Sequence, residues 1–80
     1  MSLRVIVRSD QIRNWIEERA GTPARRRNTD TDFTVLFGGD RDDYEPVSID
    51  DLLEAMRFHH VVLLVDQEAG KTFHRFIQHG

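Results

Sequence analysis

Residues 61–65 read VVLLV, the longest apolar run in the chain. A strand that is apolar on both faces is typical of the centre of a sheet, because a strand with one face in solvent alternates apolar and polar residues. We therefore expect this segment to be a central strand that is covered on both sides or close to it. The run is far shorter than the roughly 20 residues that a membrane-spanning helix needs, so we expect no membrane segment.

The N-terminal part of the chain predicts a strand followed by a helix. LRVIVR, residues 3–8, places Leu3, Val5 and Val7 on one face, and its arginines indicate an edge strand. In the next segment apolar residues recur at helical spacing and form one stripe that we expect to be buried. The members of this stripe are Ile12, Trp15, Ile16 and Ala20.

Local signals also predict where this first helix begins and ends. Ser9 or Asp10 can accept hydrogen bonds from the free amides of the first turn, as N-cap residues do. Gly21 is expected to adopt the left-handed conformation that ends a helix, and Pro23 prevents its continuation.

The middle of the chain predicts a second strand and a second helix. DFTVLF, residues 32–37, is rich in aromatic and β-branched residues and stops at a glycine pair, which is typical of a strand. GGDRDDYEP then reads as a polar loop, and the Ser48 hydroxyl is expected to cap the following helix. The buried stripe of this second helix is Ile49, Leu52, Leu53 and Met56.

Residues 72–78, TFHRFIQ, fit either a strand or a short helix, and we favour a strand that forms a hairpin with residues 61–65. The expected register places His74 opposite Leu63. The order β-α-β-α-β-β then predicts a single α+β domain, residues 1–80. In this two-layer arrangement both helices pack on one face of a three- to four-stranded sheet.

Four segments resemble a family of small uncharacterised prokaryotic single-domain proteins. QIRNWIEERAGTPA, residues 11–24, is similar to the family's pattern IRxWxExRGGxPA, with Ala20 in place of the first of two glycines. VSIDDLLE, residues 47–54, resembles ISWDEFFE with Ile-Asp in place of Ile-Trp, VVLLV resembles LALLY, and FHRFI resembles the family's aromatic and basic end. The resemblance implies a common fold, and it assigns no activity and no functional residue.

The four histidines, at positions 59, 60, 74 and 79, do not predict a metal site. Zinc needs three or four ligands within about 2 Å, and the expected register separates His74 from His60 by roughly 10 Å. The chain has no cysteine, which excludes a disulfide framework and a thiolate zinc site. We find no nucleophile beside a histidine either, so we expect no cofactor and a non-catalytic protein.

Charge is distributed unevenly along the chain. Residues 1–29 carry seven arginines and three acids, whereas residues 30–68 carry eleven acids and two arginines. The arginines Arg25, Arg26 and Arg27 could contact nucleic acid or an acidic protein partner. A pI near 5.7 and the lack of interleaved aromatic residues disfavour nucleic acid. We therefore expect a flexible charged connector that the acids farther along the chain neutralise.

If both helices cover one face of the sheet, the other face stays partly exposed. We expect Ile6, Leu36 and Leu64 to form an apolar patch there, and such patches usually mark interfaces. The expected function is therefore a small protein-interaction or regulatory module, with a homodimer through the patch or an edge strand as one form. Nucleic-acid binding through Arg25–Arg27 and metal-dependent catalysis by the histidines are the alternatives. The N-terminus shows no signal-peptide pattern, so the cytoplasm is the expected location.

Overall fold

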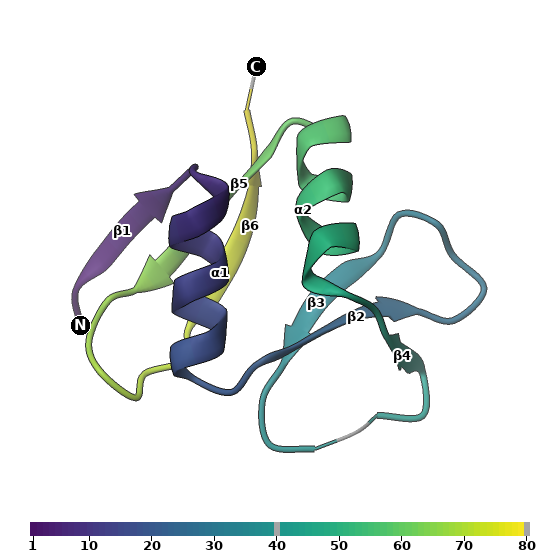
Figure 1. Ribbon diagram of the computed structural model, residues 1–80, viewed down its shortest axis with the longest axis horizontal. Helices are drawn as coiled ribbons and strands as arrows, with labels where there is room; N and C mark the ends of the chain where they lie inside the picture. The colour runs from purple at the N-terminus through teal and green to yellow at the C-terminus, as the bar shows by residue number, and fades with distance from the viewer. Residues whose placement is uncertain (40, 80) are drawn as a thin grey trace.

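The computed structural model describes residues 1–39 and 41–79, and within them the chain forms two helices and six strands (Figure 1). Their order along the chain is β-α-β-β-β-α-β-β. The elements are β1 (Leu3–Ile6), α1 (Ser9–Glu18), β2 (Thr22–Arg26), β3 (Phe33–Leu36), β4 (Tyr44–Pro46), α2 (Ile49–Phe58), β5 (Val61–Asp66) and β6 (His74–Gln78).

These strands form two antiparallel sheets of three strands each, and not one sheet. We name the sheet β1–β5–β6 the terminal sheet and the sheet β3–β2–β4 the middle sheet. Helix α2 contacts β2 of the middle sheet and β5 of the terminal sheet, so it packs against both. The α+β class is confirmed, whereas the expected order β-α-β-α-β-β and the single sheet are wrong because β2 and β4 were not predicted.

The expected connector at residues 24–32 is in part the central strand of the middle sheet. β2 pairs with β3 through Thr22↔Leu36 and with β4 through Arg25↔Glu45. Ala24 is fully buried at its middle. Pro23, which cannot donate to a ladder, lies beyond the end of the β4 pairing, so a proline is tolerated in this central strand.

The hairpin predicted within residues 61–78 is confirmed, but its predicted register is wrong. β5 is the central strand of the terminal sheet, and β6 is its hairpin partner. His74 lies opposite Val65, two residues from the expected Leu63. A shift of two residues keeps every side chain on its expected face, because side chains alternate with a period of two.

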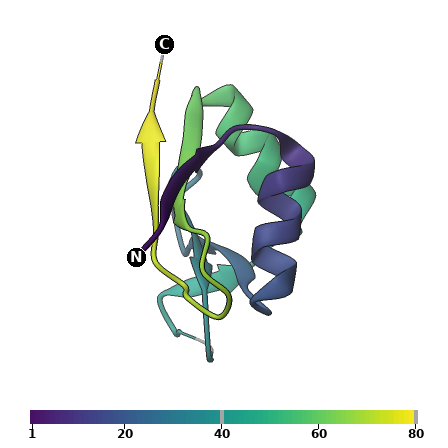
Figure 2. The ribbon, with the colours of Figure 1, turned by 90° about the vertical axis from the view of Figure 1, so that its left-hand side faces the viewer.

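Both helices lie on the same side of the terminal sheet, and its opposite side is uncovered (Figure 2). This part of the expected two-layer arrangement is present. The face toward the helices contributes Ile6, Leu63 and Val65 to the core. The same alternation directs Val5 and Leu64 to the uncovered side.

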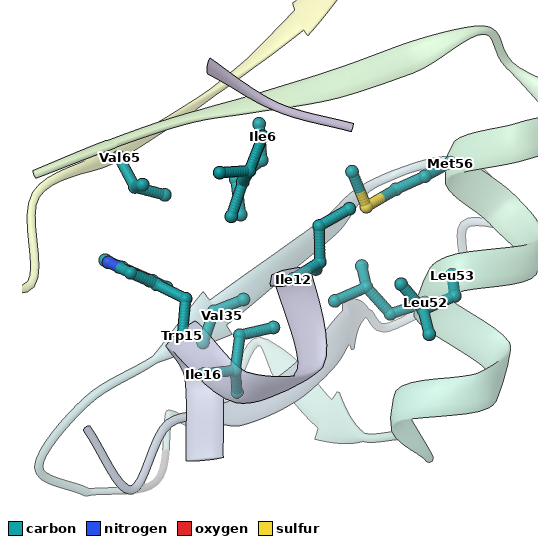
Figure 3. Packing of buried hydrophobic residues seen from close by; sticks show 10 residues of the cluster. Ile6, Ile12, Trp15, Ile16, Val35, Leu52, Leu53, Met56 and Val65 are labelled. Atoms are coloured by element: carbon teal, nitrogen blue, oxygen red, sulfur yellow. The ribbon is translucent and has the colours of Figure 1, made fainter. Parts of the chain in front are cut away.

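The core lies where α1 and α2 meet the two sheets (Figure 3). Trp15 is 6% exposed, and its Nε1–H donates to the carbonyl oxygen of Asp66 at 2.9 Å. The predicted helical stripes are largely confirmed, except that Ile49 is half-buried and Ala20 is exposed. The buried residues of the cluster are Ile6, Ile12, Trp15, Ile16, Val35, Leu52, Leu53, Met56, Leu63 and Val65.

The helix ends follow the sequence signals in one helix and depart from them in the other. The Ser48 hydroxyl accepts a hydrogen bond from the Asp51 amide at 3.0 Å, as predicted for α2. Helix α1 has Arg8 at its N-cap and no side-chain cap, so the expected cap by Ser9 or Asp10 is wrong. At the other end Ala20, with φ of 53°, takes the left-handed conformation that was expected of Gly21.

Gly21 is needed for a different reason, namely close packing. A Cβ atom at this position would lie 2.7 Å from Val35 Cγ1 and 2.8 Å from Phe37 Cε1, far inside van der Waals contact. The glycine therefore lets β3 approach the end of α1.

Substitutions at these two neighbouring positions should act in opposite directions. Gly21→Ala overpacks the core and should lower the free energy of unfolding by about 1–3 kcal/mol. Ala20→Gly relieves left-handed strain of roughly 1–2 kcal/mol, offset by a glycine entropy cost of about 0.5–1 kcal/mol. It should therefore stabilise the protein by up to about 1.5 kcal/mol. Urea unfolding followed by circular dichroism measures both, and a neutral Gly21→Ala variant would contradict the packing account.

Candidate interaction surface

The uncovered side of the terminal sheet, which we name the outer face, is predominantly apolar. Alternation along the strands assigns it Leu3 and Val5 from β1, Val62 and Leu64 from β5, and Ile77 from β6. Val7 and Phe73, directly outside β1 and β6, continue the same alternation.

Exposure on this face is unusually high for apolar side chains. Leu3, Val5, Val7 and Phe73 are 46%, 49%, 63% and 46% exposed, and they are four of the six exposed large hydrophobic residues found in the described part of the chain. Leu64 and Ile77 are partly exposed, whereas Val62 at the middle of the face is only 9% exposed. Contiguous apolar exposure of this kind is uncommon on a monomer and usually marks an interaction site.

Of the three residues expected in the apolar patch, only Leu64 lies on the outer face. Ile6 is 5% exposed and faces the helices opposite Leu63. Leu36 is half-buried in β3, in the middle sheet. The alternation in LRVIVR places Val5 and Ile6 on opposite faces of the strand. This pattern could have identified which residues of β1 are exposed on the outer face.

The arginine triplet makes ion pairs with acids on neighbouring segments. Arg25 in β2 pairs with Glu45 in β4 at 2.5 Å. The Arg26 guanidinium lies 3.8 Å from the Asp32 carboxylate, and that of Arg27 lies 3.8 Å from Glu45. The acids that follow in sequence thus neutralise the arginine triplet, as expected. The arginines and the acids lie in the middle sheet and its loops, and not in a flexible connector.

Glu45 is the acid at the centre of this arrangement. The hydrogen bonds and charge of Arg25 hold the pKa of Glu45 below its ordinary value, and the charge of Arg27 acts in the same direction. The same hydrogen bonds raise the pKa of Arg25. Both side chains are about one-third exposed, so water screens the pair and its contribution to stability is small.

The histidines have separate structural surroundings. The His74 ring lies among Trp15, Phe37 and Phe76, with ring centroids 5.5–6.0 Å away. His60 follows the C-cap residue of α2 and has φ of 55°, and its carbonyl accepts a hydrogen bond from the His79 amide at 2.8 Å. Across residues 1–39 and 41–79, no group of three or more histidine or acidic side chains could hold a metal ion.

Asp66 joins the N-terminal segment to the hairpin of the terminal sheet. Its Oδ1 accepts hydrogen bonds from the backbone amides of Glu68 and Ser2, at 3.0 Å and 3.3 Å. These bonds, that from Glu68 most, hold the pKa of Asp66 below its ordinary value although burial acts in the opposite direction. Asp66 is only 4% exposed, so this carboxylate is buried.

Comparisons of the chain with protein-family models, with curated proteins and with solved structures gave no match. In the described residues, neither helix has the length and apolar character that crossing a membrane would require.

Acid should destabilise the protein through these two carboxyl groups. Asp66 and Glu45 have lowered pKa values in the folded state. Their stabilisation is therefore complete above the unfolded-state pKa of about 4, and it is lost as pH falls through the lower folded values. Urea unfolding from pH 7 to pH 2 measures this loss. Asp66→Asn should lower stability at pH 7 and reduce its dependence on pH below 4.

Glu17→Gln is the matched control for this experiment. Glu17 is exposed on α1 and takes part in no ion pair within 4.0 Å among the described residues. Its replacement should leave the acid dependence unchanged. An Asp66→Asn variant with the same acid dependence as the parent would show that the carboxylate does not act in this way.

Proposed function

We propose that the protein is a non-catalytic interaction module that associates with a second copy of itself through the outer face of the terminal sheet. The observation that carries the proposal is the gathering of exposed apolar side chains on one side of one sheet. Burying them would remove an apolar surface from water, which is the main driving force of association.

The chemistry of the outer face favours a second copy as the partner. Arg75 is its one exposed charged side chain within β1, β5 and β6, because Asp66 is buried and hydrogen-bonded. A face with so little charge offers nothing that selects a charged partner. A flat apolar sheet is self-complementary under a two-fold axis, and two such sheets pack about 10 Å apart.

The size of the face predicts weak association. Three strands about 4.8 Å apart, over about five residues of 3.3 Å each, project roughly 250 Å². A standard interface buries about 800 Å² on each partner, so the flanking residues Val7 and Phe73 would have to contribute. We therefore expect a reversible dimer with a dissociation constant of roughly 10–300 µM.

Nucleic-acid binding through Arg25, Arg26 and Arg27 is less favoured. Each guanidinium group lies within 4.0 Å of a carboxylate of the same chain. A phosphate would have to displace these acids, and the net charge of −3 opposes its approach.

Sedimentation equilibrium between about 10 and 300 µM tests the dimer. The unmodified protein should dimerise with increasing concentration, and Val5→Glu should be monomeric because it puts a charge within the surface that the dimer buries. Val5 is 49% exposed in the single chain, so the variant should still fold, which circular dichroism checks.

Phe58→Glu is the matched control, since Phe58 is 78% exposed on α2, away from the outer face. It makes the same apolar-to-acidic change and should leave the dimer intact. A strict monomer at 300 µM, or equal loss of association in both variants, would reject the outer face as the dimer surface.

A further inference from the structure

A second surface, independent of the outer face, lies between α2 and the hairpin that joins β2 to β3. It consists of an open hollow of about 420 Å³ joined to a smaller recess of about 110 Å³. We name the two together the α2 groove. Both are lined by Thr31, Phe33, Ala55 and His59.

The floor of the α2 groove is apolar. Met56, Val61 and Phe76 line the smaller recess, which has room for one aliphatic side chain. Phe58 lines the wider hollow and is 78% exposed, the highest exposure of any large hydrophobic residue described after Met1. The Phe58 and His59 rings meet edge-on, with centroids 5.0 Å apart, and the high exposure of Phe58 leaves its ring open to solvent at the wider hollow.

Acidic side chains line the wider hollow. Asp30, Asp51 and Glu54 are exposed there, and none of them takes part in an ion pair within 4.0 Å among the described residues. Arg25 also lines the hollow, but its guanidinium is hydrogen-bonded to Glu45. The groove therefore combines an apolar floor with three carboxylates and one guanidinium, and Glu45 already pairs with that guanidinium, so negative charge predominates in the hollow.

We propose that the α2 groove binds a peptide segment of a partner protein in which a lysine or arginine stands beside an aliphatic residue. The aliphatic side chain enters the recess over Met56. The neighbouring cation lies between the carboxylates of Asp51 and Glu54 and contacts the face of the Phe58 ring, since cations are attracted to aromatic faces. Charge complementarity selects this occupant, because an acidic or nucleic-acid ligand would meet like charge.

The carboxylates are exposed, so water and salt screen them strongly. Binding should therefore be modest in affinity and sensitive to ionic strength. The aliphatic residue in the recess supplies the part of the affinity that does not depend on salt.

The test is a titration of the ¹⁵N-labelled protein, followed by amide chemical shifts, with short blocked peptides. The first probe contains the sequence Lys-Leu-Lys between alanines, and two matched probes replace both lysines by glutamine or by glutamate. The lysine peptide should bind saturably and shift amides of residues 30–33 and 51–59. The glutamine peptide should bind roughly fivefold or more weakly at low salt, and the glutamate peptide should not bind.

Glu54→Lys and Glu17→Lys are the matched pair of variants, since both replace an exposed glutamate on a helix. Glu54→Lys should weaken the lysine peptide roughly tenfold, whereas Glu17→Lys should change its affinity less than about twofold. Phe58→Ser should weaken it as well.

Four outcomes would overturn the proposal. They are equal binding of the glutamine peptide, shifts scattered over the surface, equal effects of the two charge reversals, and no saturable binding up to millimolar peptide. Loss of dimerisation in Glu54→Lys would show instead that a second copy occupies the groove. Val5→Glu should bind the lysine peptide as the parent does, so this test and that of the outer face can fail separately.

Discussion

The attachment of α1 to the turn between β5 and β6 is the constraint on which the arrangement of the other elements depends. The Arg19 side chain is only 4% exposed, and its guanidinium donates to the backbone carbonyls of Trp15, Asp66, Glu68 and Lys71. It also lies 4.5 Å from the centre of the Trp15 ring. A buried guanidinium is costly unless its donors are satisfied, and here one carbonyl of α1 and three carbonyls from the end of β5 and the following turn satisfy them. The helix is thereby fixed over the terminal sheet, which leaves the other side of that sheet uncovered.

Both the covered and the uncovered sides follow from one pattern in β1. Successive side chains point to opposite faces, so Ile6 enters the core while Val5 stays in solvent. A sheet with helices on both sides would bury the two sets equally. Here the chain has only two helices in the described residues, and both lie on the same side (Figure 2). Apolar side chains of the terminal sheet are therefore left exposed to solvent. Association with another surface is the simplest way to bury them.

Much of the fold could be predicted where local pattern and tertiary role agree. β5 is the central strand of the terminal sheet, as the apolar run VVLLV predicts, and Ser48 caps α2 as its position suggests. β2 could not be predicted, because Pro23 and the arginine triplet are typical of a loop. Its strand conformation depends on backbone pairing with β3 and β4, both of which lie farther along the chain. The register of the β5–β6 hairpin was missed for a similar reason, since its connection contains no two-residue turn that would fix the pairing.

Candidate surface residues were harder to predict than the fold. Leu64 lies on the outer face, but exposure at Leu3, Val5 and Phe73 depends on the absence of a cover, which no local pattern encodes. The α2 groove was not anticipated at all. It forms because the β2–β3 hairpin brings Asp30 and Phe33 beside the second helix, and this proximity comes from the unpredicted strand.

The pairing of β1 with β5 has a consequence for how the chain reaches this structure. Leu3 lies opposite Asp66 and Ile6 opposite Leu63. β1 can therefore pair with β5 only after the ribosome has synthesised the chain segment between the two strands. Closing a loop of about sixty residues carries an entropic cost, and pairings this distant along a chain slow folding. On a ribosome, β1 would emerge early and wait with its apolar side chains unpaired until β5 appears. Completion of the terminal sheet is therefore a late folding event, and the nascent chain is most prone to misassociation before it.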